Sequence, residues 1–191
     1  FKSSKRLLLF LLEIKLIIID EFIVKKIITN YKYIYEKYPQ YFQPEIQPFV
    51  NEKWFPKYDK KYAKSHFNKW IEELKREIPD DFYEKRKIGE NDDEICKLIQ
   101  KDSIEEFIIY INKNCYSINS TINPSNYETN NFLLKQNNIT LIEYAVFFGS
   151  IQIFNYLRQN GAELKQSLWI YAVHGQNAEI INFLEEYKSK N

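Results

Sequence analysis

Few side chains in this 191-residue sequence combine the types and the spacing that catalysis or metal binding requires. The two histidines, His66 and His174, lie far apart and lack an HxxxH spacing that could place two imidazoles on one metal ion. The acidic pairs at 72–73 and 105–106 fall on helix faces that we expect to be solvated, so they are surface charges rather than a general acid and base. Four glycines leave no phosphate-binding loop. We therefore predict a protein that is not an enzyme and that uses no cofactor or metal.

The two cysteines, Cys96 and Cys115, are too few for a disulfide-stabilised secreted domain. Both adjoin apolar residues, so we expect each to be a small buried side chain. The glycosylation sequons at Asn119 and Asn138 are short motifs that recur by chance in a chain rich in asparagine. We expect an intracellular, cytoplasmic protein. Because the sequence contains no Met and begins with Phe1, we also expect it to be a fragment.

Residues 53–70, KWFPKYDKKYAKSHFNKW, interleave lysines with aromatic side chains. Such a segment can bind single-stranded nucleic acid by base stacking and phosphate contact. However, an acidic stretch at 72–81 follows directly, and the formal net charge of the chain is only +1. An amphipathic helix with solvated lysines is the favoured interpretation, and nucleic-acid binding through this segment is the alternative.

The apolar run at 7–28, LLLFLLEIKLIIIDEFIVKKII, could be mistaken for a membrane span. Charged residues at 13, 15, 20 and 21 interrupt it before it reaches the roughly 18–20 apolar residues that a spanning helix needs. We predict no membrane span, but a buried helix whose charged positions face solvent. Residues 7–38 then form one or two helices that end at Pro39, and the three prolines within 39–49 indicate a connector.

The composition, with few glycines and few hairpin dipeptides, favours an all-α protein. A second helical pattern runs from Tyr58 to Pro79, and the acidic start at 91–94 begins a further helix. Beyond this point the chain repeats itself. TLIEYAVFFG at Thr140 and SLWIYAVHG at Ser167 match each other 27 residues apart, and SIQIFNYLR matches SIEEFIIYI upstream. Self-similarity at a fixed spacing is the signature of stacked helix pairs.

The segment TLIEYAVFFGSIQIFNYL, residues 140–157, resembles the ankyrin repeat, whose pattern is TPLHLAAxxGHxEIVxLL. NGAEL at 160–164 is similar to the NGADV that follows in that family, and 167–184 matches it at Ala172, Glu179, Ile180 and Leu184. FYEKRKIGEND, SIEEFI and EYAVFFGSIQIF resemble a large, poorly characterised ankyrin-containing family of unicellular eukaryotes. The resemblance covers roughly residues 81–187.

This resemblance implies an all-α chain with a helical N-terminal region at 1–90 and an α-solenoid of short, degenerate ankyrin-like helix pairs at 91–191. The pairs are expected at 91–114, 140–164 and 167–187, with a long insert at 115–139. Two capping boxes, Thr140 with Glu143 and Ser103 with Glu106, fit helix starts in this arrangement. Gly149 lies between two helices, where a positive φ is needed. Gln176 occupies the slot in which the family has glycine.

In ankyrin repeats the two variable positions before the glycine face the concave side. Carried over to this chain, the partner-binding positions are Phe147, Phe148, His174 and Gly175. The alternative for the phenylalanines is packing in the core, and we expect at least one of them to be packed. The predicted function is a non-catalytic scaffold that binds a protein partner. A structural spacer within a longer solenoid is a further alternative.

Overall fold

A computed structural model describes residues 5–29, 37–50 and 71–190, and the chain divides into two compact units. We call residues 1–90 with 125–135 the N-terminal unit, and residues 91–124 with 136–191 the C-terminal unit. Every regular element in the described ranges is a helix, and the β pairing found there is an isolated bridge between Thr121 and Thr140. The prediction of an all-α protein is confirmed for this part of the chain.

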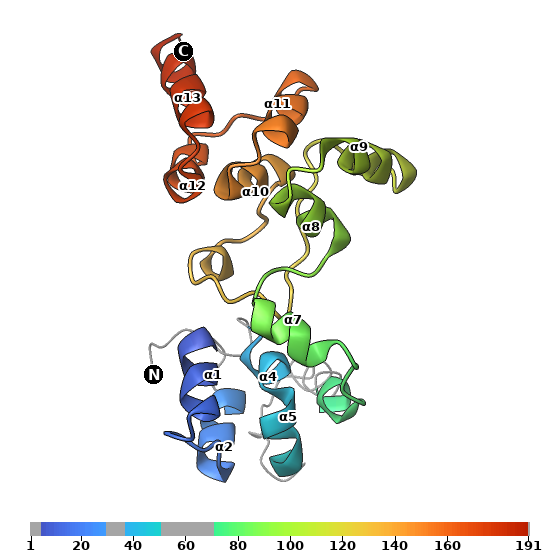
Figure 1. The fold of residues 1–191 in the computed structure, drawn as a ribbon, viewed down its shortest axis with the longest axis vertical. Coiled ribbons are helices and arrows are strands. Elements are labelled where there is room, and N and C mark those ends of the chain that lie inside the picture. Colours follow the sequence, from blue (N-terminus) through green and yellow to red (C-terminus); the bar gives the residue numbers. More distant parts are fainter. Residues whose placement is uncertain (1–4, 30–36, 51–70, 191) are drawn as a thin grey trace, which may run out of the picture. The chain divides into compact units, whose positions relative to one another are not determined.

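The N-terminal unit is made of short helices (Figure 1). It contains one cluster of buried apolar side chains. Its labelled helical elements are α1 (Lys5–Glu13), α2 (Glu21–Thr29), α4 (Tyr38–Tyr41), α5 (Gln43–Ile46), η1 (Gln47–Phe49), α7 (Phe82–Ile88) and η3 (Leu133–Lys135), and residues 71–75 are also helical. The core contains apolar side chains of α1 and α2 and a group of aromatic and aliphatic side chains from 38–46.

The apolar run at 7–28 forms two helices, α1 and α2, which the prediction of one or two helices allowed, but it is not one buried helix as we expected. The charged residues that interrupt the run also end and restart the helix. Lys15 adopts a left-handed conformation with φ of 56° just after α1, and the Asp20 carboxylate accepts a hydrogen bond from the Ile23 N–H at the start of α2. Several apolar side chains of the run are exposed, among them Phe10, Leu16 and Ile18. Within the described ranges, no helix has the length and apolar character needed to cross a bilayer.

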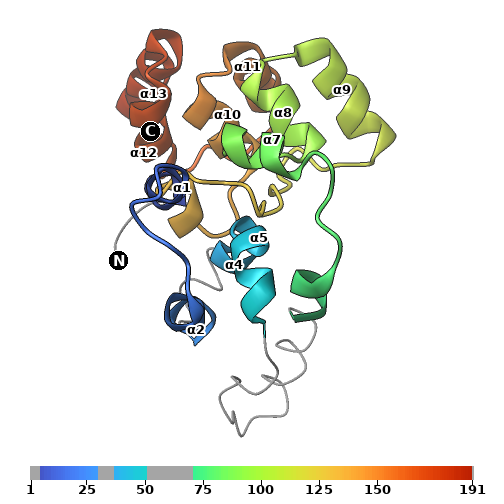
Figure 2. The same ribbon diagram turned by 60° about the horizontal axis from the view of Figure 1, so that its bottom comes forward.

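The proline-rich stretch at 39–49 is helical, although its sequence predicted a connector. Its helices α4 and α5 follow one another directly (Figure 2). Each of its three short elements, α4, α5 and η1, has a proline at one of its first two positions. A proline fits there because the first turn of a helix leaves its N–H groups without intrahelical partners, and because the fixed φ of proline suits a helix. Three prolines in this spacing therefore start three short turns.

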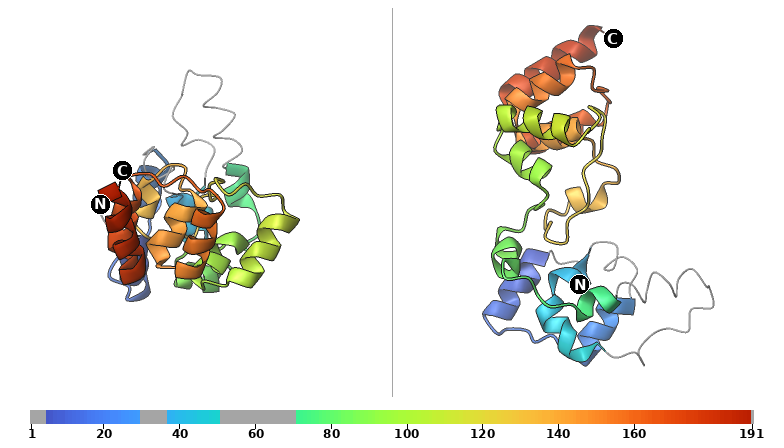
Figure 3. Two further views of the ribbon diagram at one scale, coloured as in Figure 1. Left: turned by 90° about the horizontal axis from the view of Figure 1, so that it is seen from above. Right: turned by 90° about the vertical axis from the view of Figure 1, so that its right-hand side faces the viewer.

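The C-terminal unit consists of three helix pairs. They are α8 (Glu94–Gln100) with α9 (Ile104–Lys113), α10 (Leu141–Phe148) with α11 (Ile151–Gln159), and α12 (Leu168–Gly175) with α13 (Ala178–Lys190). The first helices of the pairs, α8, α10 and α12, pack in one row, and the second helices, α9, α11 and α13, pack in another (Figures 1 and 3). The middle pair is thus covered on both sides.

The same turn joins the two helices of each pair. A left-handed residue follows the first helix in every case: Asp102 (φ 51°), Gly149 (φ 69°) and Gln176 (φ 50°). The prediction of a positive φ at Gly149 is confirmed. Gln176 adopts the same conformation despite its side chain, which costs free energy because its Cβ crowds the backbone.

Gln176→Gly should stabilise the protein by about 0.5–1 kcal/mol, because glycine adopts the left-handed conformation without steric cost. The matched control is Gln159→Gly, which changes the same side chain at the exposed, right-handed end of α11. That substitution should destabilise by about 0.5–1 kcal/mol, since glycine weakens a helix. Urea unfolding of both variants measures the two effects. If Gln176→Gly destabilised the protein as Gln159→Gly does, the backbone conformation of Gln176 would carry no strain.

Part of the predicted insert at 115–139 belongs to the N-terminal unit. The Thr129 N–H and hydroxyl both donate to the carbonyl of Gly89, at 3.1 and 2.7 Å. The Tyr127 ring lies 5.6 Å from the Phe82 ring, and the Lys5 ammonium donates to the carbonyl of Glu128 at 2.8 Å. The N-terminal unit is therefore built from two separate stretches of the chain.

Candidate protein-binding surface

The four predicted partner-binding residues lie at the adjacent C-terminal ends of α10 and α12. Phe147 and Phe148 close α10, and His174 and Gly175 close α12. The two helices pack side by side, so the structure brings all four residues together. Their positions depend on how the two helices begin.

Glu143 sets the start of both helices. Its carboxylate accepts hydrogen bonds from the Thr140 N–H at 2.9 Å, and the Glu143 N–H donates to the Thr140 hydroxyl at 3.3 Å, which is the predicted capping box. The other carboxylate oxygen accepts a hydrogen bond from the Ser167 hydroxyl at 2.9 Å, at the start of α12. Because one buried carboxylate joins both helix starts, the two helix ends are held in register. The second predicted capping box was wrong, since Ser103 makes no side-chain capping bond.

The four residues differ in what they offer to a partner. Phe147 is buried, with 9% of its surface exposed, and its ring lies 5.2 Å from the His174 ring. Phe148 is half-buried, and its ring contacts those of Phe147 at 5.1 Å and Tyr144 at 4.8 Å. His174 is exposed. The expectation that at least one phenylalanine is packed is confirmed, and it is Phe147.

Gly175 provides space rather than a contact surface. A Cβ atom at this position would lie 2.1 Å from the carbonyl oxygen of Val146 and 3.1 Å from the backbone nitrogen of Gly149. Both atoms belong to the backbone, which cannot rotate away as a side chain can. Glycine is therefore required here so that the end of α12 can approach α10. The surface available to a partner is accordingly centred on Phe148 and His174.

Tyr171 lies behind this surface on the buried side of α12. Burial raises the pKa of its hydroxyl to about 12, and the nearby Glu143 carboxylate adds to the shift because it disfavours a second negative charge. The side chain is therefore neutral at physiological pH and acts as packing.

Two apolar residues of α12 were missed by the prediction from the sequence. Ile170 and Val173 are 57% and 68% exposed, one helical turn apart on the side of α12 that faces away from its buried residues. Their spacing was a usable signal, because apolar residues at i and i+3 mark one face of a helix. The ankyrin resemblance instead implied partner-binding positions at the C-terminal end of this helix.

The other acidic, cysteine and histidine residues considered as candidates do not form a site in the described part of the chain. Glu105 and Glu106 are exposed at the first turn of α9, and among the described residues no group of three or more His, Cys, Asp or Glu side chains could hold a metal ion. Cys96 is buried as predicted, whereas Cys115 is exposed, so the prediction for Cys115 was wrong. The reason is local: Cys115 ends α9 in a left-handed turn with φ of 53°, as Gly161 does after α11. The segment 53–70 with His66 lies outside the described residues.

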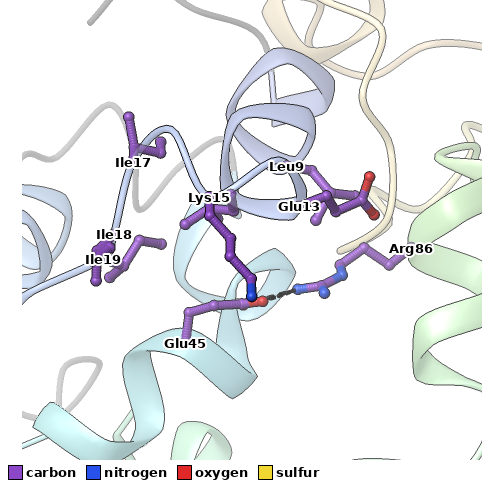
Figure 4. Close-up of a pocket in the computed structure, with 9 residues that line it drawn as sticks. Leu9, Glu13, Lys15, Ile17, Ile18, Ile19, Glu45 and Arg86 are labelled. Atoms are coloured by element: carbon purple, nitrogen blue, oxygen red, sulfur yellow. Dashed lines mark hydrogen bonds and ion pairs between the residues drawn. The ribbon is translucent and has the colours of Figure 1, made fainter.

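The N-terminal unit contains a cavity of about 470 Å³ (Figure 4). It is lined by Leu9, Leu12, Glu13, Lys15, Ile17, Ile18, Ile19, Glu45 and Arg86. Arg86 Nη1 donates to both carboxylate oxygens of Glu45 at 2.8 Å, and the Lys15 side chain extends toward the same carboxylate (Figure 4). Two acidic and two basic side chains leave the lining without net charge. The Arg86 guanidinium is already paired with Glu45, so it connects α7 to α5 and does not form an anion-binding site.

Comparisons of the chain with protein-family models, with curated proteins and with solved structures found no match.

Proposed function

We propose that the C-terminal unit is a short ankyrin-like solenoid that acts as a non-catalytic scaffold for binding another protein. Its pairs correspond to the expected repeats at 91–114, 140–164 and 167–187. Support comes from the two rows of helices and from the left-handed residue that follows α8, α10 and α12 alike. Repeated pairs of this kind bury their faces against each other and leave one continuous surface for a partner.

Hydrogen bonds that recur between successive pairs also support a repeat. The Ser150 hydroxyl donates to the carbonyl of Ile99 in the preceding pair, and the Asn177 amide donates to the carbonyl of Gly149 at 2.9 Å. Ser150 and Asn177 hold the same position, directly after the left-handed residue. The second and third pairs are thus each joined to the preceding pair by the residue directly before their second helix. Donors at the same position in two successive pairs support a repeat, although their acceptors, Ile99 and Gly149, hold different positions in it.

The observation that carries the binding surface is the aromatic cluster at the ends of α10 and α12. Phe148 is half-buried and His174 is exposed, while Phe147 supports both rings from below. Aromatic side chains held rigidly by packing lose little conformational entropy on binding, and such residues dominate the binding energy of protein interfaces. We propose that Phe148 and His174 are the anchors. Cys96 and Cys115 form no disulfide in the described part of the chain, which is consistent with the proposed intracellular location.

The test is affinity isolation of partners with the wild-type chain and with Phe148→Ser combined with His174→Ser. Retention of a specific partner should fall at least about tenfold, because losing two anchors costs roughly 2 kcal/mol or more. The control is Ile109→Ser, which removes an exposed apolar side chain (66% exposed) from α9 in the other row. A partner that binds the double variant as well as wild type would place the binding site elsewhere. Circular dichroism of each variant checks that the helices are retained.

A further inference from the structure

The free side of α12 is built like a surface that is buried elsewhere in this protein. The two first helices, α10 and α12, match at an offset of 27 residues, so Glu143, Val146 and Phe147 correspond to Ile170, Val173 and His174. The α10 residues are 7%, 0% and 9% exposed, because α12 packs over them. The corresponding α12 residues Ile170 and Val173 are 57% and 68% exposed, and His174 is also exposed. The side of α12 that corresponds to the covered side of α10 is therefore open.

The opposite end of the row is different. The accessible side chains of α8 include Glu94 and Lys97, which form an ion pair of 3.9 Å, while its apolar residues are buried. A polar outer face of this kind is how a stack of helices ends in water. The α12 end has apolar residues in the corresponding role. The two ends of the row therefore differ, with apolar side chains exposed on α12 and charged side chains exposed on α8.

We propose that this α12 surface, made of Ile170 and Val173, pairs with the same surface of a second copy of the chain across a twofold axis. In a twofold contact the same surface of each copy faces the other, so a charge on that surface would lie close to a like charge. The sequence of α12, LWIYAVHG, contains no Asp, Glu, Lys or Arg. An antiparallel crossing of the two helices would set Ile170 beside Val173 of the other copy. The pairing goes beyond the proposed scaffold function and does not depend on it.

A head-to-tail stack of copies is disfavoured by the same residues. In such a stack α12 of one copy would cover α8 of the next, and Ile170 and Val173 would lie against the charged pair Glu94–Lys97. Burying that exposed pair under apolar side chains would remove its hydration without supplying new partners. The contact between two α12 helices avoids this cost. It also closes after two copies, since the exposed apolar side of α12 is then covered in both.

The contact is small, so it should be weak, with a Kd of about 10–100 µM. Sedimentation equilibrium from about 1 to 300 µM should show the average mass rising from one chain toward two. Ile170→Lys combined with Val173→Lys should weaken association at least about tenfold, because four charges would then meet at the axis. The nearly isosteric Val173→Thr, which preserves the packing of α12, should weaken it about threefold.

The matched control is Ile109→Lys, which places the same charge at an equally exposed apolar position on α9 and should leave association unchanged. Three results would overturn the proposal: a single-chain mass over the whole concentration range, undiminished association of the double lysine variant, or an equal loss in Ile109→Lys. Association that instead grows beyond two chains would support head-to-tail stacking and also refute the twofold pairing.

Discussion

Gly175→Ala should destabilise the C-terminal unit by about 3 kcal/mol. The added methyl group would lie 2.1 Å from the Val146 carbonyl oxygen, so α12 must move away from α10 to admit it. That movement would also separate the Phe147 and His174 rings, now 5.2 Å apart. The loss should outweigh the gain in helix propensity that alanine brings, which is about 1 kcal/mol. Urea unfolding followed by tryptophan fluorescence measures the effect, since Trp169 lies on α12.

Gly161→Ala is the control for this substitution. Gly161 has a positive φ of 89°, but a Cβ atom there would meet nothing within 4 Å. Its cost is therefore backbone strain alone, about 1–2 kcal/mol. If Gly175→Ala destabilised the protein no more than Gly161→Ala does, the close approach of α12 to α10 would be refuted as the reason for glycine at this position.

Lys5→Met should destabilise the N-terminal unit by about 2–4 kcal/mol. Lys5 is fully buried, and its ammonium donates to the carbonyl oxygens of Glu128 at 2.8 Å and Asn126 at 3.2 Å. It also lies 5.1 Å from the centre of the Tyr41 ring, within range of a cation–π contact. Methionine fills similar space but leaves the carbonyl oxygens without this donor. The segment 125–135 should then detach more readily from the unit.

Hydrogen exchange read by mass spectrometry gives a local measure of this effect. Peptides from 125–135 should lose protection in Lys5→Met, because opening of this segment becomes easier. The matched control is Lys87→Met, the same change at an exposed position of α7 in the same unit, where we expect at most about 0.5 kcal/mol. Unchanged protection of 125–135 in Lys5→Met would show that the buried ammonium does not hold the segment.

Glu128 adds a charge effect to the same contact. Its side chain is buried, and burial raises the pKa of its carboxyl, while hydrogen bonds from the backbone of Asn130 and Thr129 and the charge of Lys5 oppose that shift. Removing the Lys5 charge takes away one of these opposing influences. The carboxylate in Lys5→Met is therefore less favourable at neutral pH, which increases the expected loss of stability.

Local sequence patterns were sufficient for the features that depend on neighbouring residues. The capping box of Thr140 and Glu143 and the positive φ of Gly149 are each set within one or two helical turns. The helical character of the prolines at 39–49 was missed for a related reason. A proline is compatible both with a connector and with the first turn of a helix, and the packing of Tyr41 and Phe42 into the core decided for the helix.

The sequence alone determined the all-α class of the described residues and the repeat in the second half of the chain. Helix period, caps and left-handed turns depend on residues that are close together in the sequence. The tertiary structure decided how each predicted site residue is used. Phe147 and Phe148 are adjacent and identical in type, yet one is buried under α12 and the other is half-exposed. Gly175 gives room to a backbone from another helix, and Lys5 binds carbonyl groups more than 120 residues away. Such roles depend on which distant segments meet, and no local pattern contains that information.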